Sequence, residues 1–91
     1  MCRVDSVNFN WIEGRDGLKT YINKEGLGMG FCGQCGTTLC GVMRGEVMGI
    51  TLGTLNGDPD VRIAEHIFVD SKASWDEIGG NAPQFKEGPD A

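Results

Sequence analysis

The sequence predicts a mainly β protein. Apolar and polar residues alternate with a period of two in several short stretches, which is typical of strands with one buried face. The 91 residues include 15 glycines and 3 prolines, a composition that favours many turns between short elements. No long apolar stripe with a period of 3.6 residues runs through the chain, so a helical bundle is not expected. We therefore expect short antiparallel strands in one domain over residues 1–91.

The first half of the chain is predicted to hold three strands. Each has apolar side chains at alternate positions, and each is separated from the next by a turn that contains glycine. The predicted strands cover residues 7–12, 18–23 and 27–31. The third has Gly28 and Gly30 on one face, which indicates that another backbone approaches that face closely.

The second half is predicted to hold three more strands and one short C-terminal helix. Two of these strands flank Arg44-Gly45, a connection typical of a β-hairpin. Ser71 and Ser74 are both suitable caps for the helix. The predicted strands cover residues 37–43, 46–52 and 61–69, the helix covers 71–78, and a polar tail anchored by Phe85 covers 79–91.

One face of the predicted strands is consistently apolar, and we expect it to supply much of the core. Its residues are Val7, Phe9, Trp11, Ile50, Leu52, Ile63, Ile67 and Val69. This choice of strand faces requires most of these side chains to be buried.

A C-x-x-C motif lies between the third and fourth predicted strands, in the stretch Phe31-Cys32-Gly33-Gln34-Cys35-Gly36. Two cysteines at this spacing can place both thiolates on one tetrahedral zinc ion, at Zn–S distances of ~2.3 Å. Gly36 suits the tight turn that leaves such a zinc knuckle, because glycine adopts positive φ without steric cost. The alternative is a thioredoxin-like redox pair, but that pair opens a helix, and Gly36-Thr37-Thr38 is a poor helix start. Metal is therefore favoured, and a closed site needs two further ligands.

Composition argues against several classes of partner. The net charge is −5, and the 8 basic residues are scattered among 13 acidic ones, so the basic cluster that nucleic acid binding requires is absent from the sequence. No apolar run approaches the ~20 residues that cross a bilayer, so no membrane partner is expected. No signal peptide is recognised at the N-terminus, which favours a reducing, cytoplasmic location with the cysteines free or on metal.

Six short motifs follow one another along residues 7–86. They are Trp11-Ile12-Glu13-Gly14, Leu18-Lys19-Thr20-Tyr21, the stretch from Phe31 to Leu39, Gly53-Thr54-Leu55, His66-Ile67-Phe68-Val69 and Ser71-Lys72-Ala73-Ser74-Trp75. In order and spacing they resemble the C-terminal part of the glutathione-dependent formaldehyde-activating enzyme and centromere protein V family. The resemblance implies a β-tent of packed, twisted antiparallel sheets, with one structural and one catalytic zinc site in a complete domain.

The sequence departs from that family on its N-terminal side. In the family, the pair that matches Cys32 and Cys35 shares the structural zinc with an upstream C-x-C pair, and a C-x-C-x-x-C cluster holds the catalytic zinc. Neither upstream motif is present here, so the resemblance implies two of the four structural ligands and no complete catalytic site. Cys2 can be a remnant of the catalytic cluster and a third ligand, but only 8 residues separate it from Trp11, which favours an unrelated cysteine.

The other candidate residues also have structural interpretations. Cys40 is expected to be a small buried residue of a strand rather than a ligand. His66, the single histidine, is expected to be hydrogen-bonded in the core or to line a cleft. Arg62 and Lys72 can meet an anionic substrate such as the carboxylates of glutathione, although solvated surface charge is the default.

Three functions remain open. The favoured one is a truncated or degenerate relative of the formaldehyde-activating family that keeps the fold and a metal site without independent catalysis. The second is an active zinc-dependent carbon–sulfur lyase that acts on adducts of formaldehyde with glutathione or a similar small thiol. Its catalytic zinc site would have to be rebuilt from Cys2, Cys32, Cys35 and a residue of another chain. The third is an interaction module that pairs through exposed sheet edges. Because two thiolates bind zinc weakly, we expect zinc to be absent or only partly occupied at Cys32 and Cys35. Without the upstream strands of the family, apolar sheet faces and unpaired edges are exposed, so we expect a homodimer that covers them.

Overall fold

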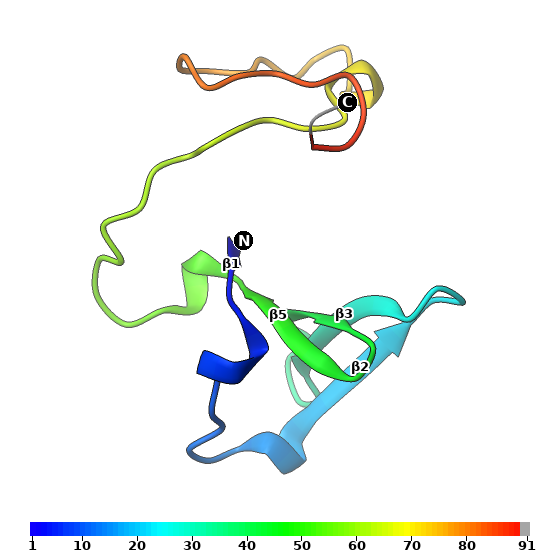
Figure 1. Cartoon of the computed structure of the whole chain (residues 1–91), viewed down its shortest axis with the longest axis vertical. Coiled ribbons are helices and arrows are strands. Elements are labelled where there is room, and N and C mark those ends of the chain that lie inside the picture. Colours follow the sequence, from blue (N-terminus) through cyan, green and yellow to red (C-terminus); the bar gives the residue numbers. More distant parts are fainter. Residues whose placement is uncertain (90–91) are drawn as a thin grey trace. The chain divides into compact units, whose positions relative to one another are not determined.

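The computed structural model describes residues 1–89, and the chain divides into two compact units at Pro59. The first unit, Met1–Pro59, contains five antiparallel strands in one open sheet (Figure 1). The second unit begins at Asp60 and, in its described part, consists mainly of irregular chain with a single 3₁₀ turn. The prediction of a mainly β chain is therefore confirmed. Within residues 1–89, no helix combines the length and the apolar character that a membrane span requires.

The strands of the sheet follow the order β1-β5-β4-β3-β2. Their bounds are β1 Cys2–Arg3, β2 Leu18–Ile22, β3 Leu27–Cys32, β4 Thr38–Met43 and β5 Glu46–Ile50. Four single 3₁₀ turns interrupt the rest of the described chain: η1 Ser6–Asn8, η2 Arg15–Gly17, η3 Leu52–Thr54 and η4 Val69–Ser71. Strands β2 to β5 thus form a meander of consecutive hairpins, and β1 is added to its β5 edge.

The turn between β2 and β3 is stabilised by the side chain of Asn23. Its Oδ1 accepts hydrogen bonds from the backbone N–H groups of Glu25 and Leu27, each over 3.0 Å. An asparagine in this role imitates a backbone turn and so fixes the direction of the chain. The turn predicted at residues 24–26 is confirmed.

The turn between β4 and β5 is the predicted hairpin connection. Arg44 and Gly45 have φ values of 51° and 83°, and positive φ at both central residues matches the natural twist of a two-residue hairpin. The register shifts between Gly41 and Val42, so that Val42 pairs with Val47 beyond a bulge. The strands predicted at 37–43 and 46–52 are therefore present with slightly shorter bounds.

The glycines of β3 allow its neighbours to approach closely. A Cβ atom at Gly28 would collide with the carbonyl oxygen of Tyr21 in β2, which confirms the predicted backbone approach on this face. A Cβ atom at Gly30 would lie 2.6 Å from Sγ of Cys40 in β4, where real Cβ atoms are essentially never found. Both positions therefore require glycine.

The buried core is small. Among the described residues, the buried hydrophobic side chains are Cys40 at 1% exposure and Val42 at 6%. The predicted burial of Cys40 is confirmed. The predicted core is mostly wrong: Val7 is 87% exposed, Ile63 70% and Ile67 42%, while Phe9, Trp11, Ile50, Leu52 and Val69 are half-buried.

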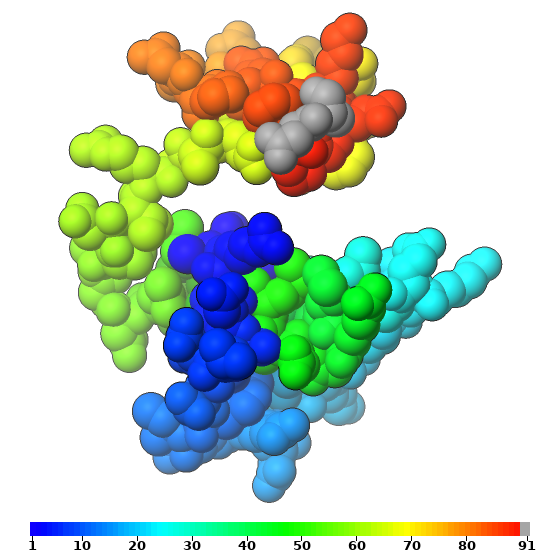
Figure 2. Space-filling view, viewed as in Figure 1, coloured from blue at the N-terminus to red at the C-terminus, as the bar shows by residue number. Residues whose placement is uncertain are grey.

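The strand predicted for residues 7–12 is wrong. The N–H of Asn8 donates to the carbonyl oxygen of Asp5 over 2.9 Å and closes a 3₁₀ turn, so this segment does not join the sheet. Phe9 and Trp11 instead pack edge to face, with ring centroids 5.1 Å apart. Figures 1 and 2 show the N-terminal segment, in blue, beside β5, in green. The hydroxyl of Ser6 donates there to a carboxylate oxygen of Glu46 over 2.9 Å.

The strand predicted for residues 61–69 is also wrong. Its only ladder contact within the described chain is a single parallel bridge between His66 and Gln84. Phe68 has a φ of 55°, a left-handed conformation that ends an extended segment. The N–H of Phe85 donates to the carbonyl oxygen of His66 over 2.8 Å, so Phe85 does connect the tail to this unit.

The helix predicted for residues 71–78 is replaced by the 3₁₀ turn at Val69–Ser71. Lys72 directly after it is extended, with ψ of 151°. So short a segment does not nucleate a helix unless tertiary packing covers one of its faces. The predicted tail, 79–91, reaches past the described residues, and its positions 90 and 91 lie outside them.

The contrast between Val42 and Val7 tests the position of the core. Replacing Val42 by Ala removes two buried methyl groups and should lower the free energy of unfolding by about 2 kcal/mol, as measured by urea denaturation. Val7→Ala, at an exposed site, should change it by less than ~0.5 kcal/mol. Equal effects of the two substitutions would show that the core lies elsewhere.

Candidate functional site

The C-x-x-C motif forms the turn between β3 and β4. Cys32 is the last residue of β3, and Cys35 lies in the turn before β4 begins. The N–H of Gly36 donates to the carbonyl oxygen of Cys32 over 2.8 Å, and the N–H of Cys32 donates to the carbonyl oxygen of Thr37 over 2.9 Å. Gly36 has a φ of 79°, which explains the glycine at this position. The predicted turn between two strands, without a following helix, is confirmed.

The two thiols of this turn interact with each other. Hydrogen bonds lower the pKa of Cys35 below its usual value. In order of decreasing effect, they come from the hydroxyl of Thr37, from the N–H of Thr37 and from the side chain of Cys32. Sγ of Cys35 lies 3.1 Å from Oγ1 of Thr37. The Cys35 side chain is exposed, and that of Cys32 is half-buried. An exposed thiol that ionises readily can bind a metal or attack an electrophile.

Cys2 and Cys40 lie away from this turn. Both pair with Ile50 from opposite sides of β5, so the two cysteines are about 10 Å apart across two strand spacings. Burial raises the pKa of Cys40. The structure does not bring Cys2 to the C-x-x-C turn, and within residues 1–89 no three or more His, Cys, Asp or Glu side chains are grouped as a metal site.

The candidate residues of the second unit are not gathered into one site. His66 is half-buried, and its Nε2 atom has no hydrogen-bond partner within the described residues. The ammonium group of Lys72 donates to the backbone carbonyl of Asp76 over 2.9 Å. Arg62 is exposed. The interpretation of these two cations as surface charges fits these positions.

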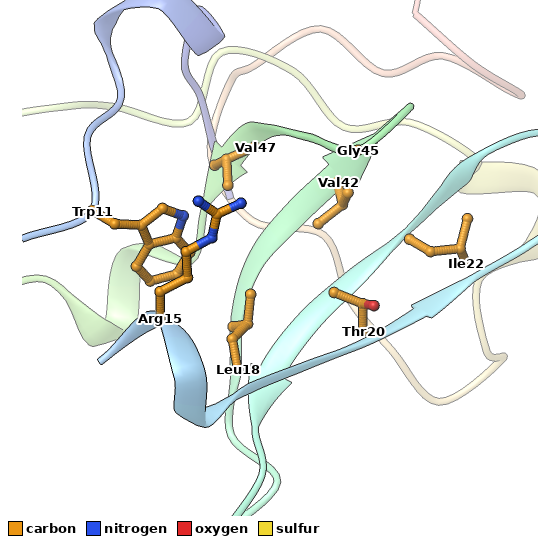
Figure 3. A pocket seen from close by; sticks show the side chains of 8 residues that line it. All are labelled: Trp11, Arg15, Leu18, Thr20, Ile22, Val42, Gly45 and Val47. Carbon is orange, nitrogen blue, oxygen red and sulfur yellow. The ribbon is translucent and has the colours of Figure 1, made fainter. Parts of the chain in front are cut away.

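A cavity of about 310 Å³ on one face of the sheet was not predicted from the sequence (Figure 3). Trp11 and Arg15 line it from the loop before β2. Its sheet wall consists of Leu18, Thr20 and Ile22 of β2, Val42 of β4 and Val47 of β5. The alternation along β2 predicts that Leu18, Thr20 and Ile22 share one face. Trp11 belongs to the alternating stretch 7–12, but no pattern in the sequence marks Arg15.

No protein-family model, curated protein or solved structure matches the chain. The resemblance to the formaldehyde-activating family therefore stays a prediction that rests on the six motifs.

Alkylation with iodoacetamide tests the environments of the cysteines. At pH 7 in the native protein, Cys35 should react first, because it is exposed and its pKa is lowered. Cys40 should react last, because it is buried and its pKa is raised. Peptide mass spectrometry after timed quenching gives the order, and comparable rates for the two residues would refute the assignment.

The variant Thr37→Val tests the cause of the Cys35 shift. Loss of the hydroxyl should raise the pKa of Cys35, so that the curve of its alkylation rate against pH moves to higher pH. The matched control is Thr38→Val, which removes a hydroxyl from the neighbouring residue at the start of β4. An unchanged curve in Thr37→Val would mean that other groups set the pKa.

Proposed function

We propose that the chain is a small metal-binding β protein of the formaldehyde-activating type, with Cys32 and Cys35 as its zinc ligands and no lyase activity of its own. The observation that carries this proposal is the turn between β3 and β4, where two interacting thiols meet and one of them has a lowered pKa. In this proposal the five-stranded sheet is one of the packed sheets of a β-tent.

The donor atoms of the turn suit zinc. Thiolates are preferred ligands of structural zinc, and a lowered pKa reduces the free energy needed to deprotonate the thiol before it binds. The hydroxyl of Thr37 lies 3.1 Å from the sulfur of Cys35, and such hydrogen bonds orient metal-bound thiolates. The turn supplies two of the four ligands that a closed tetrahedral site requires.

We place the remaining two ligands in a second copy of the chain. Residues 33–36 are exposed, so two such turns can approach each other across a two-fold axis and form a site of four cysteines. Unit one also exposes large apolar side chains that association can cover, among them Tyr21 at 71%, Leu27 at 41% and Met29 at 40%. Because a single pair of thiolates binds zinc weakly, occupancy in the isolated chain is then partial.

A reducing cytoplasm is the compartment that this proposal requires. Cys2, Cys32, Cys35 and Cys40 are all free thiols in the structure. A thiolate site for zinc depends on that reduced state, because a disulfide between Cys32 and Cys35 removes both ligands.

The lyase alternative needs a different arrangement of cysteines. It requires Cys2 to join Cys32 and Cys35, whereas Cys2 is held in β1 and separated from β3 by β5 and β4. A lyase site would therefore require β1 to leave the sheet, or a ligand set drawn from several chains.

Zinc binding and assembly should depend on each other. In native mass spectrometry with added zinc, we expect a dimer that carries one zinc ion for two chains, together with metal-free monomer that increases on dilution. The double variant Cys32→Ser, Cys35→Ser should lose both zinc and the zinc-dependent dimer. Cys2→Ser, the matched control, should keep both.

Two results would contradict this proposal. One is a monomer that retains one tightly bound zinc ion at every dilution. The other is loss of zinc in Cys2→Ser, which would place Cys2 in the metal site and favour the lyase.

An assay with formaldehyde and glutathione tests the absence of lyase activity. We expect the zinc-loaded protein not to accelerate formation of the hydroxymethyl thiol adduct, followed by ¹H NMR, above the rate with zinc and buffer alone. An acceleration that disappears in Cys2→Ser would establish the lyase instead.

A further inference from the structure

The cavity on the sheet has an apolar floor and walls. One row of paired residues crosses the sheet from β2 to β5. It consists of Ile22, Gly28, Val42 and Val47, each paired with the next on the neighbouring strand. Because Gly28 has no side chain, β3 contributes none to the cavity, and the lining from β2 faces the lining from β4 and β5. Ile22 is 42% exposed. A ligand in this trough would therefore remove apolar surface from water.

The charged group at this cavity is Arg15, and among residues 1–89 no carboxylate is paired with it. Figure 3 shows the side chain of Arg15 extending beside Trp11 and Val47. Within the described part of the chain, no hydrogen bond or ion pair joins its guanidinium group to another residue, although Glu13 and Asp16 are near in sequence. A guanidinium group is charged at every physiological pH and presents several donors in a planar fork. It can therefore bind an anion brought by a ligand.

The remaining polar groups of the lining narrow the class of anion. Apart from Arg15, the lining side chains offer the hydroxyl of Thr20 and the indole N–H of Trp11 as donors. A carboxylate carries one charge and pairs with a guanidinium through two parallel hydrogen bonds. A phosphate group carries more charge and more acceptor atoms, so this mainly aliphatic lining suits it less well.

The volume limits the size of the ligand. At ~30 Å³ for each water-sized group, a cavity of about 310 Å³ holds about ten such groups. This is the lower end of the range for small-molecule pockets. A short aliphatic or aromatic acid fits this volume.

We propose that this cavity binds small apolar monocarboxylic acids, with the carboxylate on the guanidinium of Arg15 and the apolar body against Trp11, Ile22 and Val42. The site is separate from the C-x-x-C turn and does not depend on zinc. It adds a small-molecule function to the same sheet.

Binding of 3-phenylpropionate to the full chain, without added zinc, tests this proposal. In ¹H–¹⁵N NMR spectra we expect saturable shifts confined to residues 11–22 and 42–47. Arg15→Gln should weaken the apparent affinity at least about tenfold, since it removes a charge-assisted pair. Arg62→Gln makes the same change of charge in the second unit and should leave the affinity within about twofold.

Two further measurements separate the roles of charge and shape. The neutral amide 3-phenylpropionamide should bind wild type at least about tenfold more weakly than the acid and should be unaffected by Arg15→Gln. Thr20→Phe fills the cavity from an exposed position of β2, so it should abolish binding while the dispersed amide spectrum shows that the fold is kept.

The proposal is overturned if the acid gives no saturable shifts, if the shifts lie outside the cavity, or if Arg62→Gln weakens binding as much as Arg15→Gln. Equal or tighter binding of inorganic phosphate would also overturn it, because the site would then select charge without an apolar body. None of these outcomes bears on zinc binding at Cys32 and Cys35.

Discussion

The rest of the sheet depends on the close approach of β3 to its two neighbours. At Gly28 the backbone of β2 occupies the space where a side chain would begin, and at Gly30 the sulfur of Cys40 does so. Backbone hydrogen bonds and one small buried thiol therefore hold the middle of the sheet together, without layers of large apolar residues. With glycine at both positions, β3 lies close to its neighbours along its length and ends at Cys32, in register with Leu18.

A core of this size gives the first unit little stability of its own. Small domains commonly rely on a metal, a ligand or a second subunit for the rest. A molecule that binds the folded sheet and not the unfolded chain stabilises it by mass action. The turn between β3 and β4 and the cavity beside β2 are two separate places where such binding would act, and the exposed apolar side chains of the sheet are a third.

The parts of the fold that could be predicted from the sequence are those where alternation and turn chemistry agree. Strands β2 to β5 lie close to their predicted bounds, because Asn23, Arg44-Gly45 and Gly36 fix the turns that place the strands in register. Residues 7–12 and 61–69 also alternate between apolar and polar side chains. The turn closed at Asn8 keeps the first segment out of the sheet. The second meets residues 83–87 through one bridge and a few backbone hydrogen bonds, and the left-handed φ of Phe68 keeps this contact from extending into a strand pair. The C-x-x-C turn was predictable from four adjacent residues, whereas the cavity depends on Arg15 and Trp11, whose positions only the tertiary structure determines.

The placement of β1 has a consequence for the order in which the sheet assembles. Each hairpin from β2 to β5 closes a loop of a few residues, but pairing of Cys2 with Ile50 closes a loop through nearly the whole first unit. The entropy lost on closing a loop grows with its length, so the meander can form while the N-terminus is still free. Strand β1 then joins last and leaves first. The Val4 N–H, which donates to the Met48 carbonyl over 2.9 Å beside the β1–β5 ladder, is an amide whose exchange would report this opening.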